Sequence, residues 1–354
     1  MDETQDLDGL QKAIKLYEDD RLLEAADILR SIPQTSLNDE SHSLLEKADD
    51  VEKFLRDIKG KIDQSKTVDM YQHSDHDSAS GRKMNTECKR TDDSNESDQT
   101  SLKQPQDKEM WVKQSFSGSN GRPIEIFYKL NSDGFLTLKV ESPVEKSLIV
   151  PLVSVINESE LYSSWLPQWT FPKLKLFKSE KLKQCGRASQ IIHMGVEVPW
   201  PMKKREVILS AFAIDDIDGK SGDIIVRIKS LNAGDEDGLV PPVDDKIHRI
   251  KYTGGFVFSK SNEDIQDISK TAEDQILTTF LVYIDSKLLS FPKALLDFVL
   301  RHAFGLAWKK LFKIAEEVRD GVRPAHAEAI HTKGEVFYDW VEKRIADMIH
   351  SMPQ

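Results

Sequence analysis

The strongest constraint on the fold is a series of short strand-like runs that ends in one long helical pattern. Turn segments such as GSNGRP and NSDG separate the first runs, as expected between antiparallel strands. The runs predict strands at residues 111–116, 123–130, 135–141, 173–183, 187–196, 205–214, 223–230, 248–258 and 277–283. Helical patterns occupy 144–169, 292–318 and 334–352. Because strands joined by short turns pair with each other, this order predicts an α+β fold with one curved antiparallel sheet covered by helices.

The long helix predicted at 292–318 has the sequence PKALLDFVLRHAFGLAWKKLFKIAEEV. Pro292 lies in its first turn, where a missing backbone donor costs little. Its apolar side chains cover more than one stripe, and lysine and arginine take much of the remaining surface. A wide apolar face suits a helix that covers a large concave sheet, although ordinary core packing would also explain it.

The chain divides into four regions. Residues 1–63 carry apolar residues at helical spacing and predict a small helical segment. Residues 64–108 are rich in Ser, Asp, Asn, Gln and Lys and nearly free of large apolar side chains, which predicts a disordered polar linker. Residues 109–320 contain the strands and the long helix, and residues 321–354 form a C-terminal extension with an amphipathic helix.

Composition excludes several classes of function. The 354 residues carry a net charge of −11, which argues against a general nucleic-acid binder. With only two cysteines, neither a disulfide framework nor a cysteine zinc site is expected. The acidic N-terminus has no signal-peptide pattern, and no run approaches the ~20 apolar residues of a membrane span. Common nucleotide, hydrolase and metalloprotease motifs are missing, so we expect no catalysis, no cofactor and no metal.

The order of several landmarks resembles one family. The segment IDSKLLSFPKALLDFVL leads from a strand into the long helix, VEVPWPMKKREVILSAFAI joins two strands, and NESELYSSWLPQW forms a helical segment between the first strands and the later ones. In this order they closely resemble START (steroidogenic acute regulatory-related lipid transfer) domains. The resemblance implies a START-like helix-grip fold, in which the curved sheet wraps the C-terminal helix around a tunnel for one lipid. The expected function is lipid binding, with transfer or sensing at membranes.

The resemblance also implies a gate between the C-terminal helix and the PWPMKK loop. Trp200 and Met202 are then expected to touch a bilayer, because an indole suits the membrane interface. Lys203 and Lys204 are expected to meet anionic head groups. On the helix side, the expected gate and contact residues are Phe291, Phe298, Phe304, Lys309 and Lys310.

One departure from the family concerns the cavity. Sterol-transferring members pair a buried arginine with an acid, and the matching positions here are Ala211 and Ile192. The cavity is therefore expected to be more apolar than a sterol site. Arg187, Glu197 and Arg227 are the candidate polar groups that would replace such a pair.

Two other classes of function stay open. An enzyme on the same scaffold needs an acid or base inside the cavity, whereas a degenerate START-like scaffold has a filled cavity and binds proteins. The expected partners are a lipid, an anionic membrane surface and a protein that contacts the N-terminal helices. The expected setting is the cytoplasm, with peripheral membrane contact.

Overall fold

The computed structural model describes residues 3–62, 67–69, 110–118, 121–131, 134–166, 168–170, 173–261, 275–285, 295 and 298–350. The predicted disorder of the linker at 64–108 therefore concerns residues that lie almost wholly outside the described ranges. The exception is Thr67–Asp69, which forms the short strand β1 and pairs in parallel with β2. The linker prediction is wrong for these residues, because their backbone extends the sheet at its edge.

Eleven strands of the described residues form one sheet. Their order is β1-β2-β3-β4-β11-β10-β8-β7-β6-β5, with β9 beside β7. All neighbours pair antiparallel except β1 with β2 and β7 with β9. Beyond β1, the strands are β2 (Trp111–Ser117), β3 (Pro123–Leu130), β4 (Leu136–Glu145), β5 (Lys175–Gly186), β6 (Ser189–Glu197), β7 (Lys204–Asp215), β8 (Ile224–Ser230), β9 (Ile247–Arg249), β10 (Lys251–Lys260) and β11 (Gln275–Asp285).

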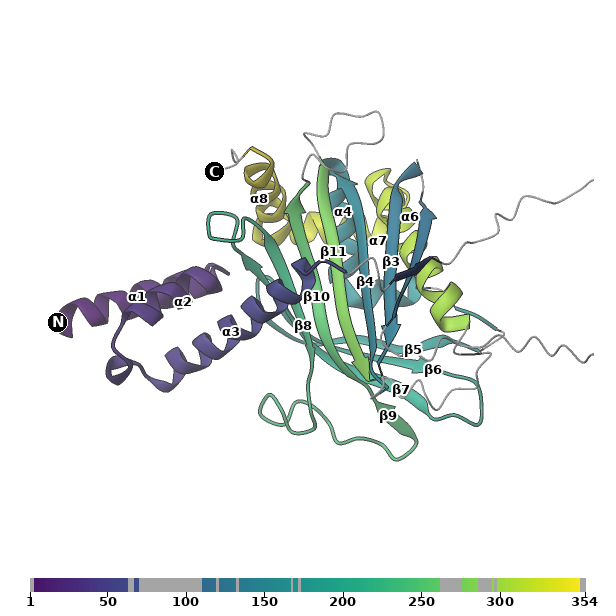
Figure 1. Cartoon of the computed structure of the whole chain (residues 1–354), viewed down its shortest axis with the longest axis horizontal. Helices are drawn as coiled ribbons and strands as arrows, with labels where there is room; N and C mark the ends of the chain where they lie inside the picture. Colours follow the sequence, from purple (N-terminus) through teal and green to yellow (C-terminus); the bar gives the residue numbers. More distant parts are fainter. Residues whose placement is uncertain are drawn as a thin grey trace, which may run out of the picture.

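Alternation of side chains sets the two faces of this sheet. In β3, for example, Ile124, Ile126 and Tyr128 are buried while the residues between them are partly exposed. Since successive strand residues point to opposite faces, each strand gives one set of apolar side chains to the concave face. The sheet curves around the helices on that face (Figure 1).

The concave face is covered by α4 (Lys146–Asn157) and α6 (Phe304–Arg319), which contact each other. A π-helical turn, η8 (Val299–Ala303), precedes α6. The main core joins the inner strand faces to α6 through Trp308, Leu311 and Phe312. This arrangement confirms the predicted α+β, START-like helix-grip fold, a curved antiparallel sheet around a long C-terminal helix. The helix predicted at 144–169 is shorter than expected, because α4 ends at Asn157 and a 3-10 helix, η4 (Ser159–Ser164), follows.

A buried ion-pair cluster fixes α6 to the sheet. Arg122, in the turn before β3, donates to Glu316 of α6 (2.9 Å) and to Glu145 at the end of β4 (2.6 Å). Its guanidinium also lies 5.0 Å from the ring centre of Phe312. Gly305 brings the other end of α6 close to β2, since a Cβ there would lie only 2.4 Å from the Phe116 ring.

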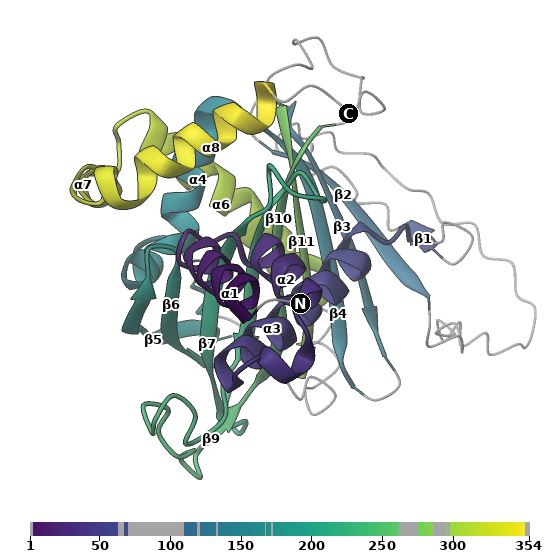
Figure 2. The same ribbon diagram turned by 90° about the vertical axis from the view of Figure 1, so that its left-hand side faces the viewer.

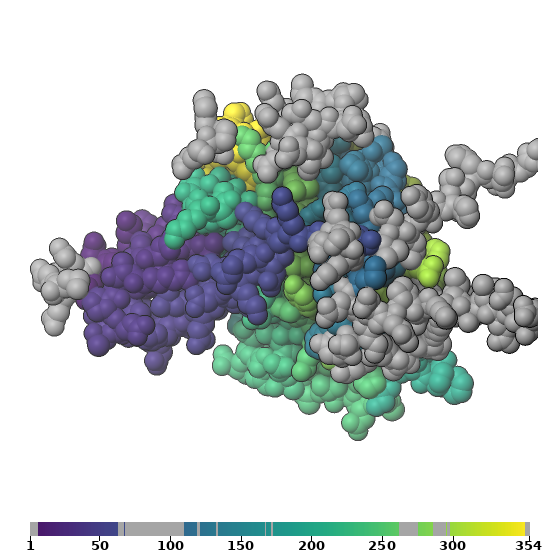
Figure 3. All heavy atoms as spheres, viewed as in Figure 1, coloured from purple at the N-terminus to yellow at the C-terminus, as the bar shows by residue number. Residues whose placement is uncertain are grey.

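The N-terminal helices pack on the convex face of the same sheet. They are α1 (Glu3–Glu18), α2 (Leu22–Ser31), the 3-10 turn η1 (Gln34–Ser36) and α3 (Asp39–Lys59). Figure 2 shows them in front of the strands, and Figure 3 shows that their outer end projects from the body of the molecule. Their shared core includes Ile214, Ile225, Val257 and Leu281 from the outer face of the sheet.

Polar contacts around α3 strengthen this interface. Arg227 of β8 binds both carboxylate oxygens of Asp50 at 2.8 and 3.1 Å, and Lys59 pairs with Asp223 at 2.5 Å. Gly254 and Gly255 pair regularly with β8 and β11, without a bulge. A Cβ at Gly255 would lie 1.9 Å from the Val226 carbonyl oxygen and 3.2 Å from the Phe54 ring, so glycine here permits close approach.

The C-terminal extension forms two helices and a π-helical turn, where the sequence pattern predicts one helix at 334–352. They are α7 (Pro324–Thr332), η9 (Gly334–Tyr338) and α8 (Asp339–His350). The extension packs on α4 through Glu158, which accepts hydrogen bonds from Lys333 (2.5 Å) and Tyr338 (2.6 Å). Burial raises the pKa of the Glu158 carboxyl, but these hydrogen bonds outweigh it, so the pKa is below its ordinary value.

Four segments that are distant in the sequence meet at one junction. The Arg187 side chain, in the β5–β6 turn, binds Asp20 between α1 and α2 at 2.6 Å and lies 4.3 Å from the Trp340 ring of α8. Asp215, at the end of β7, donates its backbone N–H to the Asp20 carbonyl and accepts hydrogen bonds from Arg344 of α8. The first and last helices are thus held at the same corner of the sheet.

Candidate functional site

A cavity of about 370 Å³ lies between the concave face of the sheet and helices α4 and α6. It falls in the size range of small-molecule sites. Side chains from β6, β7, β8, β10 and β11 form its floor, and residues of α4, η4, α6 and η9 complete the wall. Its lining side chains are Val153, Ile156, Asn157, Tyr162, Trp165, Leu166, Ala188, Gln190, Ile192, Met194, Val207, Leu209, Ala211, Phe212, Ala213, Val226, Ile228, Tyr252, Phe256, Phe258, Phe280, Ala307, Trp308, Leu311 and Phe337.

Strand alternation and register place the floor residues. Gln190 of β6 pairs with Ala211 of β7, and Ile192 pairs with Leu209, so their side chains lie on the same inner face. An aromatic cluster forms the opposite part of the wall. The ring centres of Phe256 and Phe280 are 4.7 Å apart, and Trp308 lies 5.3 Å from Phe280.

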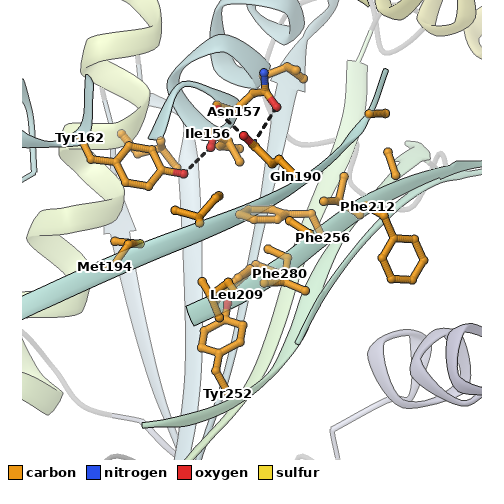
Figure 4. A pocket seen from close by; sticks show the side chains of 18 of the residues that line it. Ile156, Asn157, Tyr162, Gln190, Met194, Leu209, Phe212, Tyr252, Phe256 and Phe280 are labelled. Carbon is orange, nitrogen blue, oxygen red and sulfur yellow. Dashed lines mark hydrogen bonds between the residues drawn. The ribbon is translucent and has the colours of Figure 1, made fainter. Parts of the chain in front are cut away.

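The polar groups of the wall are few and uncharged. Gln190 donates from its side-chain amide to the Asn157 backbone carbonyl (2.9 Å) and side-chain oxygen (3.0 Å). The Tyr162 hydroxyl donates to the Ile156 carbonyl, as Figure 4 shows. Burial raises the pKa of Tyr162 and of Tyr252, so both hydroxyls stay neutral. None of the described residues that line the cavity is Asp, Glu, His, Lys, Arg or Cys.

The three charged residues that the sequence suggests for the cavity lie elsewhere. Arg187 binds Asp20 at the junction of the first and last helices, and Arg227 faces the convex side, where it binds Asp50. Glu197 is held at the surface by Lys173 (2.8 Å) and Lys204 (2.7 Å). Their assignment as cavity groups is therefore wrong. Arg227 follows the inward-facing Val226 by one position, so strand alternation directs it outward.

Two positions singled out by the departure from sterol-transferring START domains do line the cavity. Ile192 and Ala211, the positions of the family's acid and arginine, lie on its floor. No described charged residue replaces them on the wall. The expectation of a more apolar cavity agrees with this geometry.

The Pro-Trp-Pro loop lies between β6 and β7, outside the set of cavity-lining residues. Trp200 is 91% exposed, the largest exposed fraction among the exposed large apolar side chains of the described residues. Met202 is partly buried and Lys203 is exposed. Lys204 pairs with Glu197 and lies 4.7 Å from the Phe177 ring centre, so its charge is partly neutralised. The gate function of this loop stays a prediction.

The long helix α6 presents a second surface, which carries both apolar and basic side chains. A depression lined by Ser117, Gly118, Trp169, Leu306, Lys309, Lys310 and Lys313 lies on its outer side. Leu306 is 47% exposed there. Phe298, before α6, packs edge-to-face on Trp169 at 5.6 Å, and Phe304 packs against the main core. Phe291 lies outside the described residues.

Several residues of the cavity wall are not predicted from the sequence. Gln190 and Tyr252 lie in strands that contain several other polar residues, so no local sequence signal singles them out. Trp165 falls within the NESELYSSWLPQW segment, but nothing in the sequence shows that it reaches the cavity. Phe337 comes from the C-terminal extension, which sequence patterns place outside the lipid-binding region.

Among the described residues, no group of three or more His, Cys, Asp or Glu side chains is arranged for a metal ion. The described helices include none that is long and apolar enough to cross a membrane. The His- and Asp-containing tract near residue 75 lies outside the described ranges.

Comparison with known proteins gives structural neighbours only. No protein-family model matches the chain, and no curated protein matches it. Among solved structures, human STARD10 has a TM-score of 0.43 and 14% identity, over 66% of this chain and 81% of its own. Human StAR-related lipid transfer protein 5 has a TM-score of 0.40 and 10% identity, over 58% of this chain and 87% of its own.

A bacterial structure shows a similarly low level of similarity to this chain. The STAR-related lipid transfer protein of Xanthomonas axonopodis has a TM-score of 0.39 and 18% identity, over 58% of this chain and 98% of the solved fragment. Likenesses this weak say nothing about ligand or partner. The START-like fold of this chain follows from its own strand order, its enclosed helix and the cavity between them.

Proposed function

We propose that this protein binds one lipid in the cavity and exchanges it with membranes. The observation that supports the proposal is an interior space of about 370 Å³ whose wall is almost wholly apolar. An apolar cavity of this kind takes an apolar ligand, because burial of apolar surface supplies the binding free energy. Such a ligand has a low solubility in water. Membranes are therefore both its source and its destination, and the protein exchanges it with them.

Filling the cavity is the direct test. Ala211→Phe introduces a ring from the floor, and we expect extraction of radiolabelled lipid from mixed liposomes to fall at least about tenfold. The matched control is Ala327→Phe, at an exposed position of α7. The measurement is lipid that co-elutes with protein after the liposomes are removed. Equal extraction by wild type and Ala211→Phe would contradict a ligand in this cavity.

We further propose that the exposed Pro-Trp-Pro loop and the outer face of α6 make reversible contact with anionic membranes. Trp200 and Leu306 supply exposed apolar surface, and Lys203, Lys309 and Lys310 supply positive charge. Burying a large apolar side chain contributes about 1.5–3 kcal/mol. Each basic residue near an anionic surface adds about 1 kcal/mol. Neither contribution alone gives a lasting anchor, so the contact is transient.

Trp200→Ala should weaken binding to anionic liposomes about tenfold at both low and high salt, because it removes apolar insertion. Lys203→Glu should weaken binding mainly at low salt, where screening is slight. Liposome flotation measures both effects. Val336→Ala, at a residue 65% exposed on η9, is the control for loss of an exposed apolar side chain. A thermal destabilisation of Trp200→Ala with unchanged flotation would instead make Trp200 a structural residue.

The two alternative classes of function receive less support. A degenerate scaffold requires a filled cavity, whereas Phe256 and Phe258 line this one and leave it open. An enzyme on this scaffold requires an acid, base or nucleophile that reaches the ligand. The described cavity wall supplies only amides, phenols and indoles as polar groups. We therefore propose lipid binding without turnover, in a cytoplasmic setting with peripheral membrane contact.

A further inference from the structure

The indole of Trp165 stands out on the cavity wall. Its side chain lines the cavity and is only 6% exposed, yet its Nε1–H has no hydrogen-bond partner. Buried donors are nearly always paired, so an unpaired one next to an empty space points to an absent acceptor. The ring is held by an edge-to-face contact with Tyr162, at a centroid distance of 5.8 Å.

Most other polar groups of the wall already form hydrogen bonds within the protein. Gln190 donates to Asn157, Asn157 donates to Glu158, and the Tyr162 hydroxyl donates to the Ile156 carbonyl. Tyr252 differs, because its hydroxyl forms no hydrogen bond with the described residues. Figure 4 shows Asn157 and Gln190 at one end of the cavity and Tyr252 at the other, with Phe256 and Phe280 between them. The Nε1–H of Trp308, another lining residue, likewise forms no hydrogen bond with the described residues, so Trp165, Tyr252 and Trp308 are the donors available to a ligand.

The wall provides nothing that would neutralise a charged ligand. Arg187 and Arg227, two positive side chains adjacent in sequence to cavity residues, are bound to Asp20 and Asp50 outside it. A phosphate or carboxylate moved into this cavity would lose its hydration without gaining a counter-charge, which is strongly unfavourable. A volume of about 370 Å³ also lies near the lower end of the range for small-molecule sites, which favours one chain or one fused-ring body over two long chains.

We propose that the ligand is an uncharged lipid bearing a carbonyl, ester or hydroxyl oxygen, which accepts a hydrogen bond from Trp165 Nε1–H. This inference rests on the proposed lipid-binding function and specifies its ligand class. A hydrocarbon without oxygen leaves the indole N–H unpaired, and an ionised lipid leaves its charge unpaired. An oxygen acceptor on an otherwise apolar body satisfies both conditions.

Three probes with an 18-carbon chain and one double bond separate these conditions: methyl oleate, 1-octadecene and sodium oleate. We expect the full-length protein to bind methyl oleate about five- to tenfold more tightly than 1-octadecene, the value of one hydrogen bond. It should bind oleate at least about tenfold more weakly than methyl oleate at neutral pH. Displacement of a fluorescent fatty ester measures the three affinities in one assay.

Trp165→Phe keeps an aromatic ring and removes only the donor. We expect it to reduce the preference for methyl oleate over 1-octadecene to about twofold or less and to leave 1-octadecene binding unchanged. Phe256→Leu is the control, since Phe256 lines the same cavity and its side chain has no hydrogen-bond donor. It should change both affinities together and keep the preference. Tyr252→Phe, a smaller change, tests the second donor and should lower methyl oleate binding alone.

Other outcomes overturn the proposal in distinguishable ways. Tight binding of oleate, or preferential extraction of phosphatidylcholine from liposomes, would leave lipid binding intact and refute the uncharged ligand. An unchanged preference in Trp165→Phe, or an equal loss of both probes, would refute the hydrogen bond from the indole. If no probe binds and no liposome lipid is extracted, the proposed function and this inference fail together.

Discussion

Replacing Arg122 with methionine is expected to lower the free energy of unfolding by about 3–5 kcal/mol. Only 3% of the Arg122 side chain is exposed, and its guanidinium joins Glu316 of α6 to Glu145 at the end of β4. The substitution leaves Glu316, whose side chain is 11% exposed, without its partner in a poorly hydrated place. An uncompensated buried charge costs more than the ion pair contributes when intact, which explains the size of the effect.

Chemical denaturation measures this change, and a second substitution tests its cause. In Arg122→Met combined with Glu316→Leu no unpaired charge remains at the α6 contact, so at least half of the lost stability should return. Lys113→Met is a control, because its ion pair with Glu125 joins side chains that are 29% and 39% exposed. It should cost less than about 1 kcal/mol. A double variant less stable than Arg122→Met would show that packing of the guanidinium on Phe312 dominates.

Arg227→Met is expected to cost about 3–5 kcal/mol and to loosen the N-terminal helices from the sheet. The Arg227 side chain is 6% exposed. Besides Asp50, it donates to the Gly254 carbonyl at 2.7 Å and to the Thr253 hydroxyl at 2.9 Å. Its guanidinium lies 4.9 Å from the Phe54 ring of α3. One side chain therefore satisfies acceptors on both sides of the interface, and all of them lose their donor together.

Hydrogen exchange of α3 together with chemical denaturation measures this second effect. Lys229→Met supplies the matched control, since Lys229 binds the same Asp50 at 3.2 Å but its side chain is 47% exposed. The control should change stability by less than about 1 kcal/mol and preserve protection of α3. Unchanged protection of α3 in Arg227→Met would mean that the apolar contacts of Val51, Phe54 and Ile58 hold the helices without it.

Burial raises the pKa of Asp50, but the contacts with Arg227 and then Lys229 outweigh it, so the pKa is lowered overall. An acid with a lowered pKa stabilises the fold at pH values above its unfolded pKa, about 3.9, and this stabilisation is lost as the pH falls through the folded value. The contact of α3 with the sheet is therefore at full strength at neutral pH.

The sequence predicts the sheet and its enclosed helix well because these depend on local patterns. Alternation marks β3, and the turn at Asn131–Gly134 has the chemistry of a hairpin, with Gly134 at a φ of 87°. The prolines that flank Trp200 predict a loop, and the structure places that tryptophan in solvent. Ile192 and Ala211 are singled out by the resemblance to START domains, and both lie on the cavity floor.

The remaining features depend on which distant segments meet, and no local pattern contains that information. The sequence does not show the ion-pair partners of Arg187, Glu197 and Arg227. These partners, Asp20, Lys173 and Asp50, hold the three side chains outside the cavity. Docking of α1–α3 on the convex face is decided by pairwise contacts such as that of Phe54 with Gly255. The contribution of Phe337 to the cavity likewise depends on how η9 packs beside α4.

The meeting of Asp20, Arg187, Asp215 and Trp340 at one corner has a consequence for biosynthesis. Domains fold as units while the chain emerges from the ribosome, N-terminal end first. Here the first helices emerge early, but the outer sheet face that covers them includes β11, and α8 follows only at the end of the described chain. The apolar faces of α2 and α3 therefore stay exposed to solvent for most of translation. During that interval the nascent chain exposes an apolar helical surface that promotes aggregation. The solubility of the nascent chain therefore depends on the speed of elongation and on chaperones that cover this surface.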